Sequence, residues 1–288
     1  MSFAKGPEEA NPSWEKYLVT IAATCLSFVI GLFLAAFLMR SFSDGQQTWS
    51  AMEFAINLIP HIFGLAGLLA SVRFIHNRPI LSVITSRKSF DWRRFFFAAG
   101  LWLTFQMVFM LMARSAGAPI VFEFSVPKLI PLLLVSLLLL PIQTAFEDIF
   151  FRGYLFQGFT KATGKAGASV LAVAVIFGLI HAGNPEMKVL GNIAMVYYII
   201  SGLFLGLLAH FDDGLELGMG YHFANNFFGA VIVTNTWQVF QTNALFTDYG
   251  EPSFGWELLL PLLVLQPLML CAFYRIYRWK NPLKRILE

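Results

Sequence analysis

Long apolar stretches without a charged residue recur along almost the whole chain, and they restrict the possible folds more than any other feature. A helix that crosses a membrane needs roughly 20 consecutive apolar residues. Stretches of about that length are Tyr17–Met39, Phe54–Val72, Phe95–Ala113, Leu129–Phe146 and Val189–Phe211. Three others complete the series: Ala166–Ile180, the first part of Leu217–Thr247, and Leu258–Tyr274. We therefore predict an all-α, polytopic membrane protein with about eight transmembrane helices.

The composition indicates that lipid, rather than water, surrounds most of the chain. Hydrophobic residues make up 57% of the 288 residues and charged residues only 13%, whereas soluble proteins carry about 25% charged residues. We expect the bilayer to be a partner and expect no nucleic acid partner. Cys25 and Cys271 both fall within apolar stretches, which favours packing roles over a disulfide or a metal pair.

The distribution of lysine and arginine predicts the orientation of the chain, because cytoplasmic connections carry the excess of these residues. If the N-terminus is cytoplasmic, 16 of the 20 lysines and arginines fall on the cytoplasmic side. The exceptions are Arg40, Arg114, Lys128 and Lys188. An even number of spans then places both termini in the cytoplasm, and in a bacterium the membrane is the cell membrane. We predict a cytoplasmic N-terminal tail at 1–16, one transmembrane helical domain at 17–278 and a basic cytoplasmic tail at 279–288.

The first group of buried polar residues lies at the end of the fourth apolar stretch, in the sequence Phe-Glu-Asp-Ile-Phe-Phe-Arg-Gly that starts at Phe146. An ionisable side chain inside a spanning helix costs several kcal/mol unless it has partners, so each is a functional hypothesis. Asp148 and Arg152 are four residues apart and share a helical face, which favours a supporting ion pair. Glu147 is rotated by about 100° from Asp148. It must therefore find its partner on another helix, and we interpret it as a candidate catalytic residue.

The second polar residue is His181, at the end of the fifth apolar stretch. A lone histidine in an apolar helix is usually a packing residue, but its depth favours a functional role here. If the fourth and fifth helices form an antiparallel hairpin that turns through Lys161–Gly167, Glu147 lies 14 residues before this turn and His181 lies 14 residues after it. At a rise of ~1.5 Å per residue both lie about 20 Å from the turn. The two side chains can therefore meet.

The third group is His222 and Asn226, which are four residues apart and share a helical face. Three glycines precede them and allow a neighbouring helix to approach closely. Taken alone, this pair is more typical of hydrogen bonds that join helices. Of the other histidines, we interpret His61 as a packing residue, His76 as solvated in a basic loop and His210 as a residue at a helix end.

Together these residues suit the hydrolysis of a peptide bond. Such hydrolysis needs an activated water, a proton donor for the leaving amine and donors for the developing oxyanion. We assign water activation to Glu147 with His181, and oxyanion stabilisation to His222 with Asn226. In an alternative chemistry, Glu147, His181 and His222 bind a divalent metal such as zinc while Asn226 polarises the substrate. The residues do not decide between these two chemistries.

In their order and spacing, the three motifs resemble those of the CPBP family of CAAX-protease and bacteriocin-processing intramembrane proteases, also called Abi proteins, which includes the type II CAAX prenyl endopeptidases. The motifs are Glu-acid-x-x-x-Arg from Glu147, Phe-x-x-x-His ending at His181, and His-x-x-x-Asn from His222. The resemblance covers about 129–233, which we take as the catalytic core. It implies an eight-helix fold, a site within the membrane that opens to the cytosol, and the roles assigned above.

One residue departs from the family pattern. The first motif usually holds two glutamates, whereas this chain has aspartate at position 148. Because Asp148 lies on the face of Arg152, we expect a small effect on the ion pair and little effect on the chemistry. If Asp148 were the base instead, a shift of its carboxylate by about 1 Å would cost ~100-fold in rate.

Three functions follow from these observations. The first is an endopeptidase acting on a membrane-tethered peptide or lipidated protein, for which a prenylated CAAX-type C-terminus is one candidate. The second is a non-catalytic immunity or scaffolding protein of the same fold. The third is a transporter that uses Glu147 and His181 as a proton relay, although the paired halves or broken helices typical of transporters are not evident in the sequence.

Overall fold

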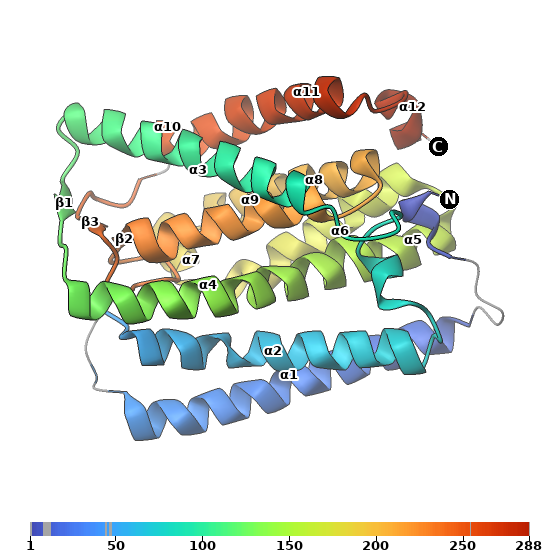
Figure 1. The fold of residues 1–288 in the computed structure, drawn as a ribbon, viewed down its shortest axis with the longest axis horizontal. Helices are drawn as coiled ribbons and strands as arrows, with labels where there is room; N and C mark the ends of the chain where they lie inside the picture. Colours follow the sequence, from blue (N-terminus) through green and yellow to red (C-terminus); the bar gives the residue numbers. More distant parts are fainter. Residues whose placement is uncertain (1, 8–12, 44, 46–47, 254, 288) are drawn as a thin grey trace.

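The computed structural model describes every residue except 1, 8–12, 44, 46–47, 254 and 288. Its long helices lie side by side along one direction and form a bundle (Figure 1). The helices are α1 (Trp14–Phe42), α2 (Ala51–Phe74), α3 (Trp92–Ser115), α4 (Val126–Asp148), α5 (Phe156–Thr163), α6 (Ala166–Ile180), α7 (Pro185–Leu190), α8 (Ile193–Asp212), α9 (Glu216–Phe227), α10 (Trp256–Leu260), α11 (Gln266–Tyr277) and α12 (Pro282–Leu287).

Shorter elements join and extend these helices. Three-residue and four-residue 3-10 turns cover Phe3–Lys5, Ile80–Val83 and His181–Gly183. π-helical segments cover Ile149–Leu155, Phe228–Ile232 and Pro261–Leu265. The strands β1 (Ile120–Phe122), β2 (Val233–Asn235) and β3 (Phe246–Asp248) form a small sheet in the order β1-β3-β2. β3 pairs antiparallel with β1 and parallel with β2.

Seven of the described helices are long and apolar enough to cross a membrane. They are Trp14–Phe42, Ala51–Phe74, Trp92–Ser115, Val126–Thr163, Ala166–Gly183, Ile193–Asp212 and Leu258–Tyr277. Each overlaps one of the apolar stretches in the sequence, which confirms the prediction of an all-α, polytopic fold. The chain is an integral, multi-pass membrane protein.

The eighth predicted span is shorter than expected. Within the stretch Leu217–Thr247, α9 and the π-helical segment after it stop at Ile232, short of the roughly 20 residues that a full span needs. This helix packs against α3, α4 and α8. Because other helices surround it, it can carry more polar residues than a helix that faces lipid.

The outer surface of the bundle is apolar. Phe33 on α1 is 74% exposed and Leu138 on α4 is 68% exposed. In water, large exposed apolar patches promote association, whereas lipid chains solvate them. Cys25 and Cys271 are exposed as well, so the expectation that both are packing residues is wrong.

The hairpin that was expected between the fourth and fifth helices is present. α4 continues through the π-helical segment Ile149–Leu155 into α5 without a break, and α5 ends at Thr163. Gly164 follows with a φ of 69°, a left-handed conformation that glycine adopts at low cost. α6 then begins at Ala166 and packs against α5. The hairpin therefore returns the chain against α5 and the π-helical segment, which follow Glu147 in the sequence.

The two ends of the bundle carry different elements. Figure 1 places both chain termini at one end, and the three strands at the opposite end; we call these the termini end and the strand end. The shared location of the termini agrees with an even number of passes. Which of the two ends faces the cytosol is a prediction that rests on the charge distribution.

Candidate active site

The predicted site residues come from separate helices and line one cavity. Glu147 lies near the end of α4, His181 directly follows α6, and His222 and Asn226 belong to α9. All four line a cavity of about 530 Å³ inside the bundle. The fold thus gathers residues that are far apart in the sequence, although not all of them touch.

Glu147 is surrounded by groups that donate hydrogen bonds or can carry a proton. Gln143 Nε2 donates to Glu147 Oε1 at 2.5 Å. His61 Nε2 lies 3.6 Å from Oε1, and His222 Nε2 lies 3.7 Å from Oε2. Because Glu147 is only 9% exposed, its carboxylate depends on these partners rather than on bulk water. The two histidines belong to α2 and α9, so Glu147 does have partners on other helices.

Asp148 and Arg152 form an ion pair that also holds a site histidine. Arg152 Nη1 donates to Asp148 Oδ1 at 3.1 Å, and each residue is 1% exposed. The second oxygen of Asp148 lies 3.2 Å from His222 Nδ1. The Arg152 guanidinium also lies 3.8 Å from the centre of the Phe177 ring, a favourable cation–π geometry. Asp148 therefore orients His222, with Nδ1 toward Asp148 and Nε2 toward Glu147.

Asn226 is linked to Glu147 through Gln143. Asn226 Nδ2 donates to Gln143 Oε1 at 2.9 Å, while the amide nitrogen of Gln143 donates to Glu147. The neighbouring Asn225 accepts a hydrogen bond from Trp102 Nε1 at 3.2 Å. These bonds join α9 to α4 and α3, and they fix the position of Asn226 along the bundle.

His181 lines the cavity without contacting Glu147. Its Nδ1 donates to the Phe177 carbonyl at 2.7 Å, and its ring stacks on Tyr198 with 4.3 Å between ring centres. Because Nδ1 carries the donated proton, Nε2 is the acceptor nitrogen of the neutral ring. Among the described residues, His181 makes neither a hydrogen bond nor an ion pair with Glu147. Both side chains therefore line one cavity, but the direct contact that their matched depth made possible is not found between them.

The cavity leads from Glu147 toward the strand end. Its lining outside the long helices belongs to segments at that end and includes Trp49, Asn184, Glu186, Trp237, Phe240 and Asp248. Glu186 on α7 is tied to the same region, since its Oε1 accepts the Val239 N–H at 2.8 Å. The site therefore opens away from the termini. As a consequence, cytosolic termini and a site that opens to the cytosol cannot both be correct.

Two residues that contact Glu147 were not predicted from the sequence. His61 was interpreted as a packing residue, yet its Nε2 faces the Glu147 carboxylate and it lines the cavity. The general rule that an ionisable group within a span is a functional hypothesis applied to it equally. Gln143 lies one helical turn before Glu147, so the four-residue spacing on α4 was the signal for it.

Two histidines outside the cavity are buried, and one of them differs from expectation. His76 is buried, with Nε2 3.0 Å from the Tyr154 hydroxyl, so the interpretation as a solvated loop residue is wrong. His210 lies near the end of α8, as expected, but it is buried and its Nε2 donates to the Arg285 carbonyl at 3.0 Å. Both therefore serve the packing of the termini end.

The candidate metal ligands are not arranged as a metal site. The proposed ligands were Glu147, His181 and His222. Among the described residues, no group of three His, Cys, Asp or Glu side chains is arranged to hold an ion.

Comparison with known proteins supports the resemblance. Residues 127–228 match the model of the type II CAAX prenyl endopeptidase Rce1-like family, which confirms over this segment the resemblance drawn from the three motifs. The chain is also 29% identical over 276 residues to an uncharacterized protein, YyaK, of Bacillus subtilis (strain 168), with 89% of this chain and 90% of the relative covered. No solved structure matches. Since the matched family consists of proteases, the match supports peptidase activity.

Proposed function

We propose that this protein is an intramembrane endopeptidase that hydrolyses a peptide bond in a membrane-tethered substrate. The observation that carries the proposal is the buried Glu147 carboxylate, which lies between His61 and His222 at the inner end of a cavity. The match of 127–228 to a protease family supports the same reaction class. A prenylated CAAX-type C-terminus is one candidate substrate, which the family resemblance suggests.

In the first step Glu147 acts as the general base. A water molecule in the cavity gives a proton to the Glu147 carboxylate while its oxygen attacks the scissile carbonyl carbon. His181 assists, because its Nε2 can accept a hydrogen bond from the same water. A positioned base of this kind contributes typically ~10²–10⁴-fold to the rate.

In the second step the tetrahedral intermediate collapses. The carbon–nitrogen bond breaks, and the proton held by Glu147 passes to the leaving amine nitrogen. His222 and Asn226 line the cavity beside Glu147, and we assign them as the donors that stabilise the oxyanion. A donor aimed at an oxyanion in a site with little water contributes about 3 kcal/mol to lowering the barrier.

Other residues position this machinery. Arg152 and Asp148 hold His222 in one orientation, and Gln143 links Asn226 to Glu147. Asp148 is therefore a positioning residue in the proposed mechanism.

The proposed mechanism needs no metal. We therefore expect that exhaustive chelation of divalent ions leaves the cleavage rate of the purified protein unchanged. A loss of activity that added zinc restores would favour the metal chemistry instead.

The test is a comparison of membrane-anchored peptides from cells that carry the wild-type protein or Glu147→Gln. We expect cleaved fragments in the wild-type sample that are missing with Glu147→Gln, while the uncleaved precursor accumulates. A matched control is Glu123→Gln, a substitution at an exposed glutamate outside the spans. If the peptides are the same in all three samples, the proposed activity is wrong, and a non-catalytic membrane role becomes the better account.

A further inference from the structure

The two ends of the bundle differ in their access to the proposed active site. The cavity that contains Glu147 is lined at its outer part by residues of the strand end, including Trp49, Glu186 and Trp237. Ser201 on α8 contributes to the wall of this cavity. A substrate that reaches Glu147 along the cavity must therefore enter from the strand end.

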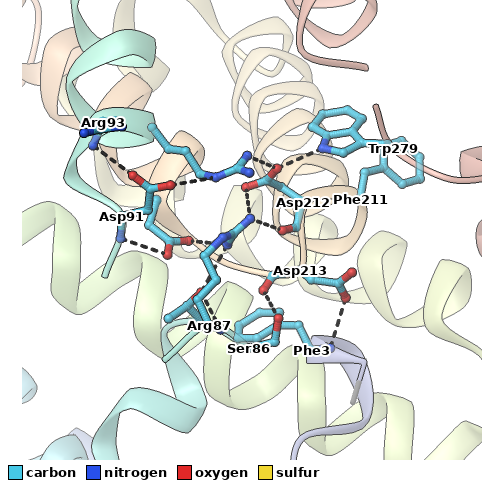
Figure 2. Close-up of polar contacts among 12 residues, drawn as sticks. Phe3, Ser86, Arg87, Asp91, Arg93, Phe211, Asp212, Asp213 and Trp279 are labelled. Atoms are coloured by element: carbon cyan, nitrogen blue, oxygen red, sulfur yellow. Dashed lines mark hydrogen bonds and ion pairs between the residues drawn. The ribbon is translucent and has the colours of Figure 1, made fainter. Parts of the chain in front are cut away.

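A network of charged residues closes the termini end (Figure 2). Asp212, at the end of α8, pairs with Arg87 at 2.8 Å and with Arg94 at 2.6 Å. The Trp279 indole N–H donates to the same carboxylate at 2.8 Å. The side chain of Asp212 is only 1% exposed. These contacts join the segment before α3, the end of α8 and the C-terminal segment, and none of the residues that make them lines the cavity that contains Glu147.

The charged residues also indicate which end faces the cytosol. Of the 20 lysines and arginines, the four at the strand end are Arg40, Arg114, Lys128 and Lys188. Arg152 had been counted with the cytosolic loops, but it is buried in the bundle, so it does not contribute to the asymmetry. The remaining 15 belong to the segments and helix ends at the termini end. By the positive-inside rule the termini end is cytosolic and the strand end faces the other side of the membrane.

The cavity lining favours one type of charge in the substrate. Its carboxylates are Glu147, Glu186 and Asp248, and no lysine or arginine occurs among the described residues that line it. A site that grips a free C-terminal carboxylate normally supplies a cationic side chain for it. This lining instead suits a neutral or basic peptide segment.

From these observations we propose that the cavity is loaded from the extracytoplasmic side, and that it takes a neutral or basic internal segment of a membrane-anchored peptide exposed there. This assignment of substrate class rests on the proposed endopeptidase function. It separates the protein from enzymes that process a C-terminus presented in the cytosol.

Access to the cavity can be measured without any cleavage reaction. In a Cys25→Ala/Cys271→Ala background, Ser201→Cys places a thiol on the cavity wall and Ser89→Cys places one in the exposed loop of the termini end. Intact cells are then treated with a membrane-impermeant cationic methanethiosulfonate or with its anionic sulfonate counterpart. Unreacted thiol is counted by mass spectrometry of the purified protein.

We expect Ser201→Cys to react with the external cationic reagent in intact cells, roughly tenfold or more faster than with the anionic one. Ser89→Cys should react only after the cells are permeabilised. Labelling of Ser201→Cys only after permeabilisation, or from neither side, would overturn access from outside. Equal rates for the two reagents would overturn the charge preference. Because labelling does not require turnover, these outcomes are independent of whether Glu147→Gln abolishes cleavage.

Discussion

At the scale of single residues, the site is a chain of ionisable side chains, each of which is at most 9% exposed. Arg152 holds Asp148, Asp148 holds His222, and His222 faces Glu147. A buried charge that loses its partner costs far more than the pair contributed, because the remaining ion stays desolvated. The arrangement thus couples the stability of this region to the orientation of the catalytic groups.

This coupling predicts the effect of removing Arg152. Arg152→Met leaves the Asp148 carboxylate buried without its cation and should lower the free energy of unfolding by ~3–5 kcal/mol. Adding Asp148→Asn to the same protein removes the stranded charge and should restore much of the loss. Thermal unfolding of the purified variants in detergent measures both effects. An Arg152→Met variant that unfolds at the wild-type temperature would show that the pair contributes little.

His61 is the residue whose role the sequence did not reveal. Its contact with Glu147 predicts that His61→Gln lowers the cleavage rate by about 10²-fold, with a change in stability within about 1 kcal/mol. The matched control is His76→Gln, which alters a buried histidine far from the cavity and bonded to Tyr154. It should lower the unfolding temperature and leave the cleavage rate of the folded protein unchanged. The opposite pattern would return His61 to a packing role.

Sequence reasoning at this scale succeeded where helical spacing decides and failed where tertiary packing decides. Four-residue spacing was enough to expect contact between Asp148 and Arg152. The proximity of His61 to Glu147 depends on how α2 packs against α4, and no local pattern encodes that. The second contact of Asp148, with His222, depends in the same way on the placement of α9.

At the scale of elements, α9 positions half of the proposed site. It packs tightly on α3 at Gly220, where an added Cβ would lie 2.1 Å from the Phe95 carbonyl oxygen. The glycines before His222 were expected to permit such an approach. The short length of α9 was not predicted. An uncharged stretch predicts a full span both when the whole stretch is helical and when part of it forms strands and a loop. The π-helical segments were not foreseen either, since π-helical turns have no strong local sequence signal.

Two neighbouring glycines of α9 test this packing. Gly220→Ala should force α9 away from α3, cost about 1–3 kcal/mol of stability and reduce cleavage by displacing His222. Gly218→Ala is the control, since a Cβ there meets its nearest neighbour at an ordinary 3.5 Å. Unfolding temperature and cleavage rate of the two variants give the comparison. Equal behaviour of the two would mean that the α3–α9 contact is not tight.

At the scale of the whole molecule, the bundle is closed at one end and open at the other. The N-terminal segment takes part in the closure, since the Phe3 N–H donates to Asp213 Oδ1 at 3.1 Å and Phe3 is buried (Figure 2). Phe3 and Ala4 of the predicted N-terminal tail are therefore packed into the bundle. Apolar stretches were enough to predict the class of fold. The direction in which the cavity opens could not be predicted from these stretches, because it depends on how the helices and loops pack at each end of the bundle.

The closure of the termini end predicts the effect of Asp212→Asn. This change removes the charge that pairs with Arg87 and Arg94, both of which are partly exposed, so the loss should be about 1–3 kcal/mol rather than the larger cost of a fully buried pair. The C-terminal segment should also become more sensitive to trypsin at Lys280. The control is Asp91→Asn, which affects a more exposed pair and should cost less than about 1 kcal/mol. Unchanged proteolysis of Asp212→Asn would argue against a closing role.

The most direct test of the central claim is cleavage by the purified protein in lipid nanodiscs. Its substrate is a peptide identified from the comparison of membrane-anchored peptides, and the variants are wild type, Glu147→Gln and Glu123→Gln. We predict that Glu147→Gln loses about 10³-fold or more in rate while it unfolds at the wild-type temperature, and that Glu123→Gln cleaves like wild type. A Glu147→Gln protein that cleaves within a few-fold of the wild-type rate would contradict the assignment of Glu147 as the base of an intramembrane hydrolase.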